Sequence, residues 1–441
     1  MNHSYSVGPY SDAYAPPHDI RALAHHDRLA AGLRRAAWWC FASGIVAHVL
    51  LSAPSLFYLG IMYDAPGGSV LEKIHPGIWL VLLADVLMLA SQGNPLRLAV
   101  SRLGEDPLLG TYVVFQTMTV AWLVLRHGGA GAINVFGTLI LPYFCVWLIG
   151  KLDARRQHRL LAIIVGLLVV NTLIGIAESI VQVKFIPFRM GGKQESLEDF
   201  FRPSALLGHP LTNSMVTAIL LPAPLYLRIA TAWRVGLMVL LWVGTITFGG
   251  RTGFVLSTLA YGLYFPAWLA LKAVRGRFTY LQLTGGAVGA VLIIIVVAMV
   301  VLSTGIGERI FQTLVWDGSA NVRVQVWRVF DYISDQDLMT GVSPSTIIAI
   351  GTTMGLGDTE AIENFWLVLL LQTGWLAFPV FLIGILCAFA WMWRESSGSM
   401  RVAVLLFIAI GSSNNSLATK TPVMLLFMSV LAIARARPFS R

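Results

Sequence analysis

The stretch TITFGGRTGFV, residues 245–255, places one arginine inside a long apolar run. Gly249 and Gly250 precede Arg251 and Gly253 follows it, so the backbone there can adopt a positive φ and approach another segment closely. A guanidinium beside the N–H groups of such a turn can bind an anion, and its planar fork suits phosphate in particular. The alternative is an arginine that anchors a helix end to lipid phosphate groups.

Two further arginines lie in polar segments that interrupt the apolar sequence. Arg202 belongs to segment 182–209 and Arg323 to segment 304–363. Either guanidinium could contribute to a phosphate site, and the alternative for each is an ion pair with an aspartate nearby in the sequence. These two segments hold most of the polar residues from which a site could be built.

Glu363 is the carboxylate whose position in the sequence best suits proton transfer. Asn364 and a long apolar run follow it, so Glu363 lies at the start of a predicted helix. A glutamate there can act as a general base, although nearby arginines weaken it in this role. The alternative role is electrostatic, because negative charge is favourable near a helix N-terminus.

The elements that position these residues are predicted by composition. Apolar residues make up 56% of the 441 residues, charged residues only 12%, and the mean hydropathy is +0.73. Apolar runs recur along nearly the whole chain at the length that a helix needs to cross a bilayer of about 30 Å. We therefore predict an all-α polytopic membrane protein with about twelve transmembrane helices. The predicted spans are 38–60, 76–90, 108–126, 132–150, 159–181, 210–229, 234–249, 252–271, 280–303, 364–392, 400–418 and 421–436.

The orientation follows from the lysines and arginines, which accumulate in cytoplasmic loops. Most of the 31 basic residues fall on one side if the N-terminus is inside, and both termini are then cytoplasmic. We predict a cytoplasmic tail over 1–37 and one transmembrane domain over 38–441. Segments 182–209 and 304–363 then lie outside. The net charge of +9 is explained by this topology and by contact with anionic lipid, so no nucleic-acid partner is expected.

Five stretches in the second half of the chain resemble the O-antigen ligase and polysaccharide polymerase superfamily of membrane glycosyltransferases. Their order and their placement relative to the predicted membrane also match, over roughly residues 200 to 380. The stretches are FRPSALLGHPLTNSMVTA (201–218), TFGGRTGFV (247–255), NVRVQVW (321–327), GVSPS (341–345) and IENFWLVLLLQTGWLAF (362–378).

The resemblance implies a GT-C-like enzyme in the bacterial inner membrane, with a large periplasmic loop between spans nine and ten. Such an enzyme takes a glycan from undecaprenyl pyrophosphate, or a similar polyprenyl carrier, to an acceptor glycan or glycolipid. It uses no nucleotide donor, metal or other cofactor, and the outer segments contain no HExxH motif and no Cys/His ligand pairs. A magnesium ion held by scattered aspartates is the alternative.

The resemblance also implies a role for each candidate residue. Arg251 and Arg202 are the expected pyrophosphate contacts, with Arg323 as a third, because fixed cations stabilise the charge that develops on the leaving group. Glu363 is the expected catalytic base, with Arg251 as its catalytic partner. Supporting roles fall to His209, Asn213, Trp327 and Asn364.

One departure from the family bears on the type of reaction. Ligases of this family carry His-Asn where this chain has Glu363 and Asn364, which favours a polymerase of exopolysaccharide or O-antigen repeat units. An O-antigen ligase that transfers the glycan to lipid A core is the alternative. A polysaccharide transporter or flippase is a second alternative, but the predicted spans are nearly free of charge, with Asp85 and Glu178 as the main exceptions.

Overall fold

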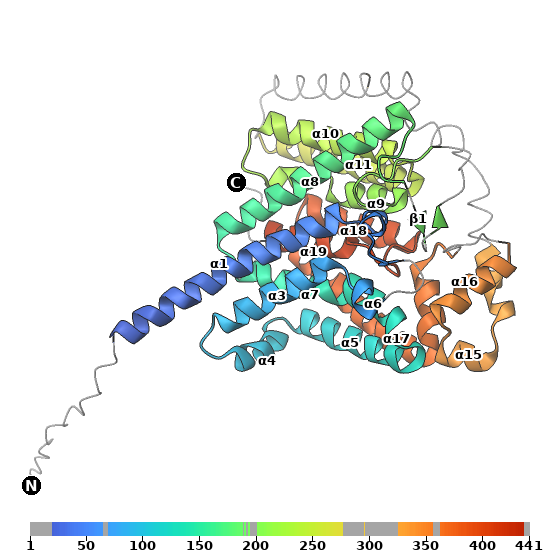
Figure 1. The fold of residues 1–441 in the computed structure, drawn as a ribbon. Coiled ribbons are helices and arrows are strands. Elements are labelled where there is room, and N and C mark those ends of the chain that lie inside the picture. The colour runs from blue at the N-terminus through green and yellow to red at the C-terminus, as the bar shows by residue number, and fades with distance from the viewer. Residues whose placement is uncertain are drawn as a thin grey trace, which may run out of the picture.

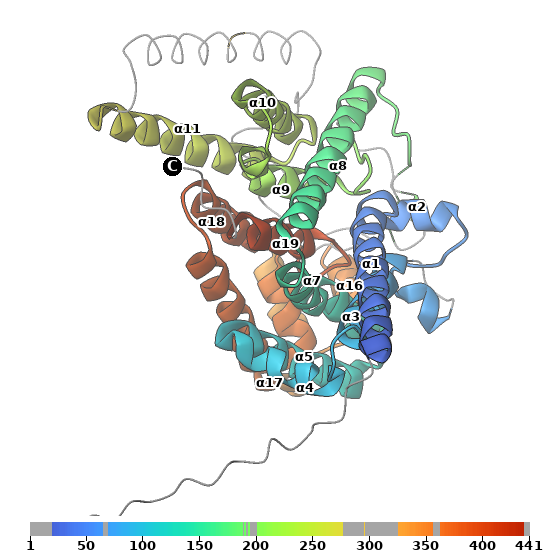
Figure 2. The same cartoon turned by 90° about the vertical axis from the view of Figure 1, so that its left-hand side faces the viewer.

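The structure is a computed structural model in which the described residues form a bundle of helices (Figures 1 and 2). The described residues are 20–64, 69–187, 189–190, 193–194, 201–276, 295, 325–355 and 362–435. Arg323 and nearly all of the predicted span 280–303 lie outside them. The only strands in the described part are β1 (Arg189–Met190) and β2 (Lys193–Gln194), which pair antiparallel, with Arg189 opposite Gln194.

The first half of the chain supplies α1 (Ile20–Leu50), α2 (Ala53–Tyr58), the 3-10 helix η1 (Val70–Lys73), α3 (Pro76–Ala90), α4 (Pro95–Glu105), α5 (Pro107–His127), α6 (Gly129–Val135), the short π-helix η2 (Phe136–Ile140), α7 (Leu141–Gly150) and α8 (Ala154–Val181). The second half supplies α9 (Pro210–Leu220), the 3-10 turn η3 (Ala223–Tyr226), α10 (Thr231–Thr247), α11 (Arg251–Val274), the 3-10 helix η4 (Val326–Tyr332), α15 (Asp335–Thr340), α16 (Pro344–Thr353), α17 (Phe365–Glu395), α18 (Ser399–Ser412) and α19 (Val423–Arg435).

Five helical stretches of the described chain are long and apolar enough to cross a membrane. They are Pro107–His127, Ala132–Gly150, Ala154–Val181, Arg251–Val274 and Phe365–Glu395, and each coincides with a predicted span. A sixth would be the pair α3 and α4, which is bent by 111°. Helices α10, α18 and α19 are apolar but shorter. The helices thus give five or six candidate spans where the sequence predicts twelve.

Two predicted spans end earlier than their apolar sequence suggests, for local reasons. The helix of span 210–229 stops at Leu220, since Pro222 and Pro224 cannot donate the backbone hydrogen bonds that would continue it. In span 38–60, α1 stops at Leu50, ahead of the separate helix α2 with its proline at the start. Helix α1 also runs without a break through the predicted boundary at residue 37.

Helix α19 lies in the middle of the bundle. Its residues from Val423 to Leu431 are all buried, which is typical of a helix that is apolar on every side. Phe427 stacks on Phe407 of α18 with ring centroids 4.8 Å apart. Around this centre, α1 packs on α3 and α5 packs on α17, as both ribbon views show (Figures 1 and 2).

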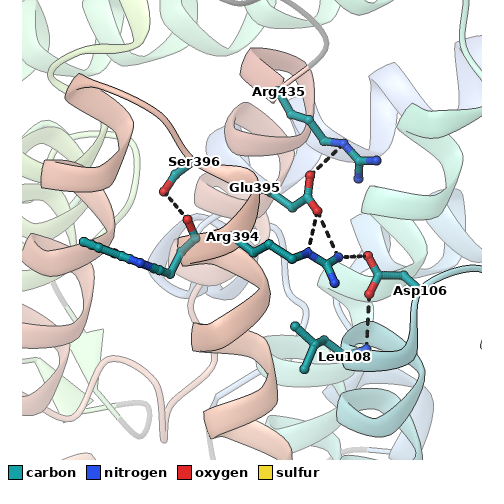
Figure 3. Close-up of polar contacts among 7 residues, drawn as sticks. Asp106, Leu108, Arg394, Glu395, Ser396 and Arg435 are labelled. Carbon is teal, nitrogen blue, oxygen red and sulfur yellow. Dashed lines mark hydrogen bonds and ion pairs between the residues drawn. The ribbon is translucent and has the colours of Figure 1, made fainter.

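A charged cluster joins three helix ends on one side of the bundle (Figure 3). Arg394, near the end of α17, bonds to Asp106 at the start of α5 and to Glu395 beside it, and Arg435 at the end of α19 lies 2.8 Å from Glu395. The basic-residue pattern assigns Arg394 and Arg435 to the same cytoplasmic side. The opposite ends of α17 and α19 are therefore the ends at which an outer site is expected.

Candidate functional site

A polar cleft at the start of α17 brings together three of the sequence-predicted residues. Arg202, Arg251 and Glu363 all line it, although they come from the loop before α9, the first turn of α11 and the loop before α17. With the open solvent at its mouth included, the cleft holds about 500 Å³ of space between atoms. We call it the arginine cleft; its other lining residues are Leu211, Ser214, Met215, Gly249, Gly250, Thr252, Gly253, Ile410, Ser413 and Asn414.

The first glycine of the turn positions both arginines. Gly249 adopts φ +67°, a conformation that residues with a side chain rarely adopt, and it ends α10 so that α11 can begin at Arg251. The stem of Arg202 passes over it, with Cγ and Cδ each 3.6 Å from where a Cβ on Gly249 would lie. The turn thus sets Arg251 at a helix start and provides the surface on which Arg202 lies.

The other two glycines are required by the close approach of α9. A Cβ on Gly250 would lie 2.1 Å from Ser214 Oγ, and one on Gly253 would lie 2.5 Å from the same atom. The Ser214 hydroxyl donates to the carbonyl of Gly250 over 3.2 Å. The sequence analysis gave two uses for the three glycines, positive φ and close approach; Gly249 has a positive φ, whereas Gly250 and Gly253 allow the close contact with Ser214.

A buried carboxylate holds the loop that carries Arg202. Glu178, fully buried at the end of α8, accepts hydrogen bonds from the backbone N–H groups of Phe185 (2.8 Å), Ser204 (2.9 Å) and Ala205 (3.0 Å). Hydrogen bonds to an ionised acceptor are the stronger kind. The intramembrane acid that the sequence singled out as an exception therefore fixes the backbone two residues after Arg202.

Two asparagines extend this brace. Asn171 of α8 donates to the side-chain oxygen of Asn213 over 2.8 Å and accepts from the N–H of Leu206 over 2.9 Å. Asn213 donates in turn to the carbonyls of Ser204 (2.6 Å) and His209 (3.0 Å). Asn213, predicted from the sequence as a supporting residue, holds the 204–209 loop.

Asn414 fixes the start of α17, where Glu363 lies. Its carbonyl accepts from the N–H of Phe365 over 3.0 Å, and its side-chain oxygen accepts from the N–H of Ser416 over 2.9 Å. The sequence analysis did not select Asn414 or Ser413, although the polar run SSNNS at 412–416 between two apolar stretches was a usable signal. Asn364 caps α17 by accepting from Leu367 N over 3.2 Å.

The electrostatics of the arginine cleft favour an anion. Two guanidinium groups face one carboxylate, and α11 begins at the cleft with no side chain capping its N-terminus. The first N–H groups of a helix carry partial positive charge and can bind phosphate oxygens. Among the described residues that line the cleft, Glu363 is the only carboxylate.

His209 and Trp327 lie in the described part of the chain and do not line the arginine cleft. His209 caps α9, its Nδ1 accepting from Leu211 N over 3.2 Å, and it lines a neighbouring cavity. Trp327 is 55% exposed on η4 and stacks on Phe330. Arg323 lies outside the described residues.

The remaining acidic residues of interest have structural partners. Asp85 binds Arg102 through both carboxylate oxygens, at 2.8 and 3.0 Å, so this pair closes the corner between α3 and α4. In the first turn of α15, Asp337 accepts from the Ser334 hydroxyl over 2.8 Å and lies 3.6 Å from Arg126. Within the described residues no cluster of three His, Cys, Asp or Glu side chains could hold a metal ion.

The apolar helices define a helical membrane protein. Comparison of the chain with protein-family models gives no match, and comparisons with curated proteins and with solved structures give none either.

Proposed function

We propose that the protein is a membrane glycosyltransferase that takes a glycan from a polyprenyl pyrophosphate, such as undecaprenyl pyrophosphate, to an acceptor sugar. In this proposal it polymerises repeat units of an exopolysaccharide or O-antigen at the periplasmic face of the bacterial inner membrane. The observation that carries the proposal is the meeting of Arg202, Arg251 and Glu363 in one cleft.

In this proposal the two arginines of the cleft act on the leaving group, and Glu363 acts on the acceptor. The bond between the anomeric carbon and the pyrophosphate oxygen breaks, and negative charge grows on the leaving pyrophosphate beside Arg202 and Arg251. The acceptor hydroxyl forms the new bond to the anomeric carbon and gives its proton to Glu363. The reaction needs neither a nucleotide donor nor a metal ion, because the donor is already activated and the charge is balanced by arginines.

The proposed topology is of the GT-C type, with about twelve spans and both termini in the cytoplasm. The cleft lies at the start of α17, and the charged cluster of Asp106, Arg394, Glu395 and Arg435 lies at the end of the same helix. This separation supports a periplasmic cleft, since the basic-residue pattern places the cluster on the cytoplasmic side.

Product analysis with purified protein tests the proposal. The protein is given a polyprenyl-pyrophosphate oligosaccharide alone, and then the same donor together with a lipid A core acceptor. We expect longer lipid-linked chains from the donor alone, which identifies a polymerase. Transfer only to the core would replace the polymerase by a ligase, and no transfer in either reaction would overturn the proposal.

A further inference from the structure

A second cavity lies beside the arginine cleft and shares a wall with it. On the first turn of α9, Leu211 faces the arginine cleft and the next residue, Thr212, lines the second cavity. In the turn after α18, Asn414 lines the cleft while Asn415 and Ser416 line the second cavity. The two hollows are therefore separated by little more than one helix start and one turn.

We call this second space the hydroxyl cavity; with the open solvent at its mouth included, it holds about 940 Å³ of space between atoms. Thr212 and Ser416 are each only 3% exposed, and neither hydroxyl has a hydrogen-bond partner within the described part of the chain. Neither oxygen is sealed inside the protein, so each hydroxyl is available for a hydrogen bond to water or to a ligand in the cavity. Two such hydroxyls on neighbouring walls indicate a ligand with several hydrogen-bonding groups of its own.

The charges of the hydroxyl cavity balance, unlike those of the arginine cleft. Asp64 and Lys420 both line it and have opposite charge. Both ring nitrogens of His75 are occupied, by the carbonyl of Leu51 (2.7 Å) and the N–H of Gly77 (3.0 Å), and burial lowers the pKa of His75 to about 4. This imidazole is thus neutral, and among the described lining residues the one lysine is matched by one aspartate, in contrast to the two arginines and one glutamate of the arginine cleft.

Flat rings lie beside these polar groups. The rings of His48 and His75 stack 4.3 Å apart, and the edge of Tyr63 meets His75 with centroids 5.4 Å apart. All three residues line the cavity. A wall of rings together with hydroxyl and amide groups suits a molecule with apolar C–H faces and many hydroxyls, which is the character of a sugar ring.

We propose that the hydroxyl cavity binds the acceptor as a neutral oligosaccharide, with Thr212 and Ser416 hydrogen-bonded to its hydroxyl groups. This inference rests on the proposed function, because the sugar held in the cavity must extend past the 414–416 turn for its acceptor hydroxyl to reach Glu363 in the cleft. The cleft binds the charged end of the donor, and the cavity binds the uncharged acceptor sugar.

Sugar retention by the full-length protein in nanodiscs tests the inference without requiring catalysis. The probe is the oligosaccharide pool released by mild acid from the polyprenyl-linked fraction of the source cell, labelled at its reducing ends. We expect the wild-type protein to retain neutral oligosaccharides from this pool. Thr212→Val and Ser416→Ala should each weaken retention about five-fold, which corresponds to the loss of one ordinary hydrogen bond to the sugar. Retention of only acidic sugars, or of none, would overturn the inference.

Two kinds of variant separate this inference from the proposed function. Arg251→Lys changes the cleft alone and should retain the sugars as wild type does. Thr117→Val removes a hydroxyl from α5, outside both hollows, and controls for loss of a hydroxyl in general. If Arg251→Lys loses transfer while Thr212→Val and Ser416→Ala leave retention intact, the cavity proposal fails and the enzyme proposal stands. If the wild type retains neutral sugars but transfers none, the enzyme proposal fails and the binding of neutral sugars by the cavity stands.

Discussion

Ser214 and Gly250 hold the arginine cleft together, because the Ser214 hydroxyl donates to the Gly250 carbonyl over 3.2 Å and leaves no room for a side chain on Gly250. The contact joins the first half of α9 to the residue before α11. It therefore fixes Arg251 relative to the loop that carries Arg202. The site depends on this contact between helices as much as on the arginines themselves.

Gly250→Ala should destabilise the protein by about 1 to 3 kcal/mol, the usual cost of overpacking a tight contact. The added Cβ would lie 2.1 Å from Ser214 Oγ and 2.4 Å from Ser214 Cβ. Thermal unfolding in detergent measures the loss. Adding Ser214→Gly should recover part of it, whereas Gly236→Ala in α10, which meets nothing within 4 Å, should cost nothing. A Gly250→Ala protein as stable as the wild type would contradict the close contact.

Arg251→Lys should slow glycan transfer about 100-fold, because a point charge cannot replace the paired hydrogen bonds of the guanidinium on a leaving phosphate. Initial rates with a polyprenyl-pyrophosphate oligosaccharide check this. Arg275→Lys, at the exposed end of the same helix, is the matched control. Equal rates for both variants would return Arg251 to the role of a lipid anchor.

Glu178→Gln should raise the KM for the donor more than it lowers kcat. The carboxylate accepts three backbone N–H groups around the Arg202 loop, and an amide must turn a donor toward some of them. Each hydrogen bond to a charged group contributes about 1.5 to 3 kcal/mol, so Arg202 should be held less firmly. Glu105→Gln breaks only an exposed pair with Lys151 and is the control. An unchanged donor KM would show that Glu178 does not act through Arg202.

Glu363→Gln should lower kcat about 100-fold or more and leave donor binding intact, since glutamine cannot accept the proton of the acceptor hydroxyl. Single-turnover transfer and donor binding, measured on the same preparation, separate the two effects. Glu72→Gln, on the turn η1 outside both hollows, is the control. Wild-type turnover in Glu363→Gln would assign Glu363 to the electrostatics of the helix start.

The sequence predicts those features of the fold that depend on nearby residues. Apolar runs identify the membrane-crossing lengths of α5, α8, α11 and α17, because the length and composition of a segment decide whether it can cross a bilayer. The prediction of one helix over 210–229 was wrong, although Pro222 and Pro224 already marked the break in the sequence. Local chemistry of this kind needs no knowledge of the rest of the chain.

The site itself depends on contacts between distant parts of the chain, and only the tertiary structure decides these. The glycines around Arg251 indicated a tight turn. The sequence could not show that Ser214 packs against this turn, because Ser214 and Gly250 are 36 positions apart in the chain. The sequence marked Glu178 only as an unusual charge in a predicted span, and the fold shows that it accepts a hydrogen bond from the backbone N–H of Ser204. The sequence by itself determined a membrane protein with candidate arginines, because hydropathy and charge are local properties. The packing of α9, α11 and α17 decided which of them meet, since side chains from separate helices are brought together only when the bundle closes.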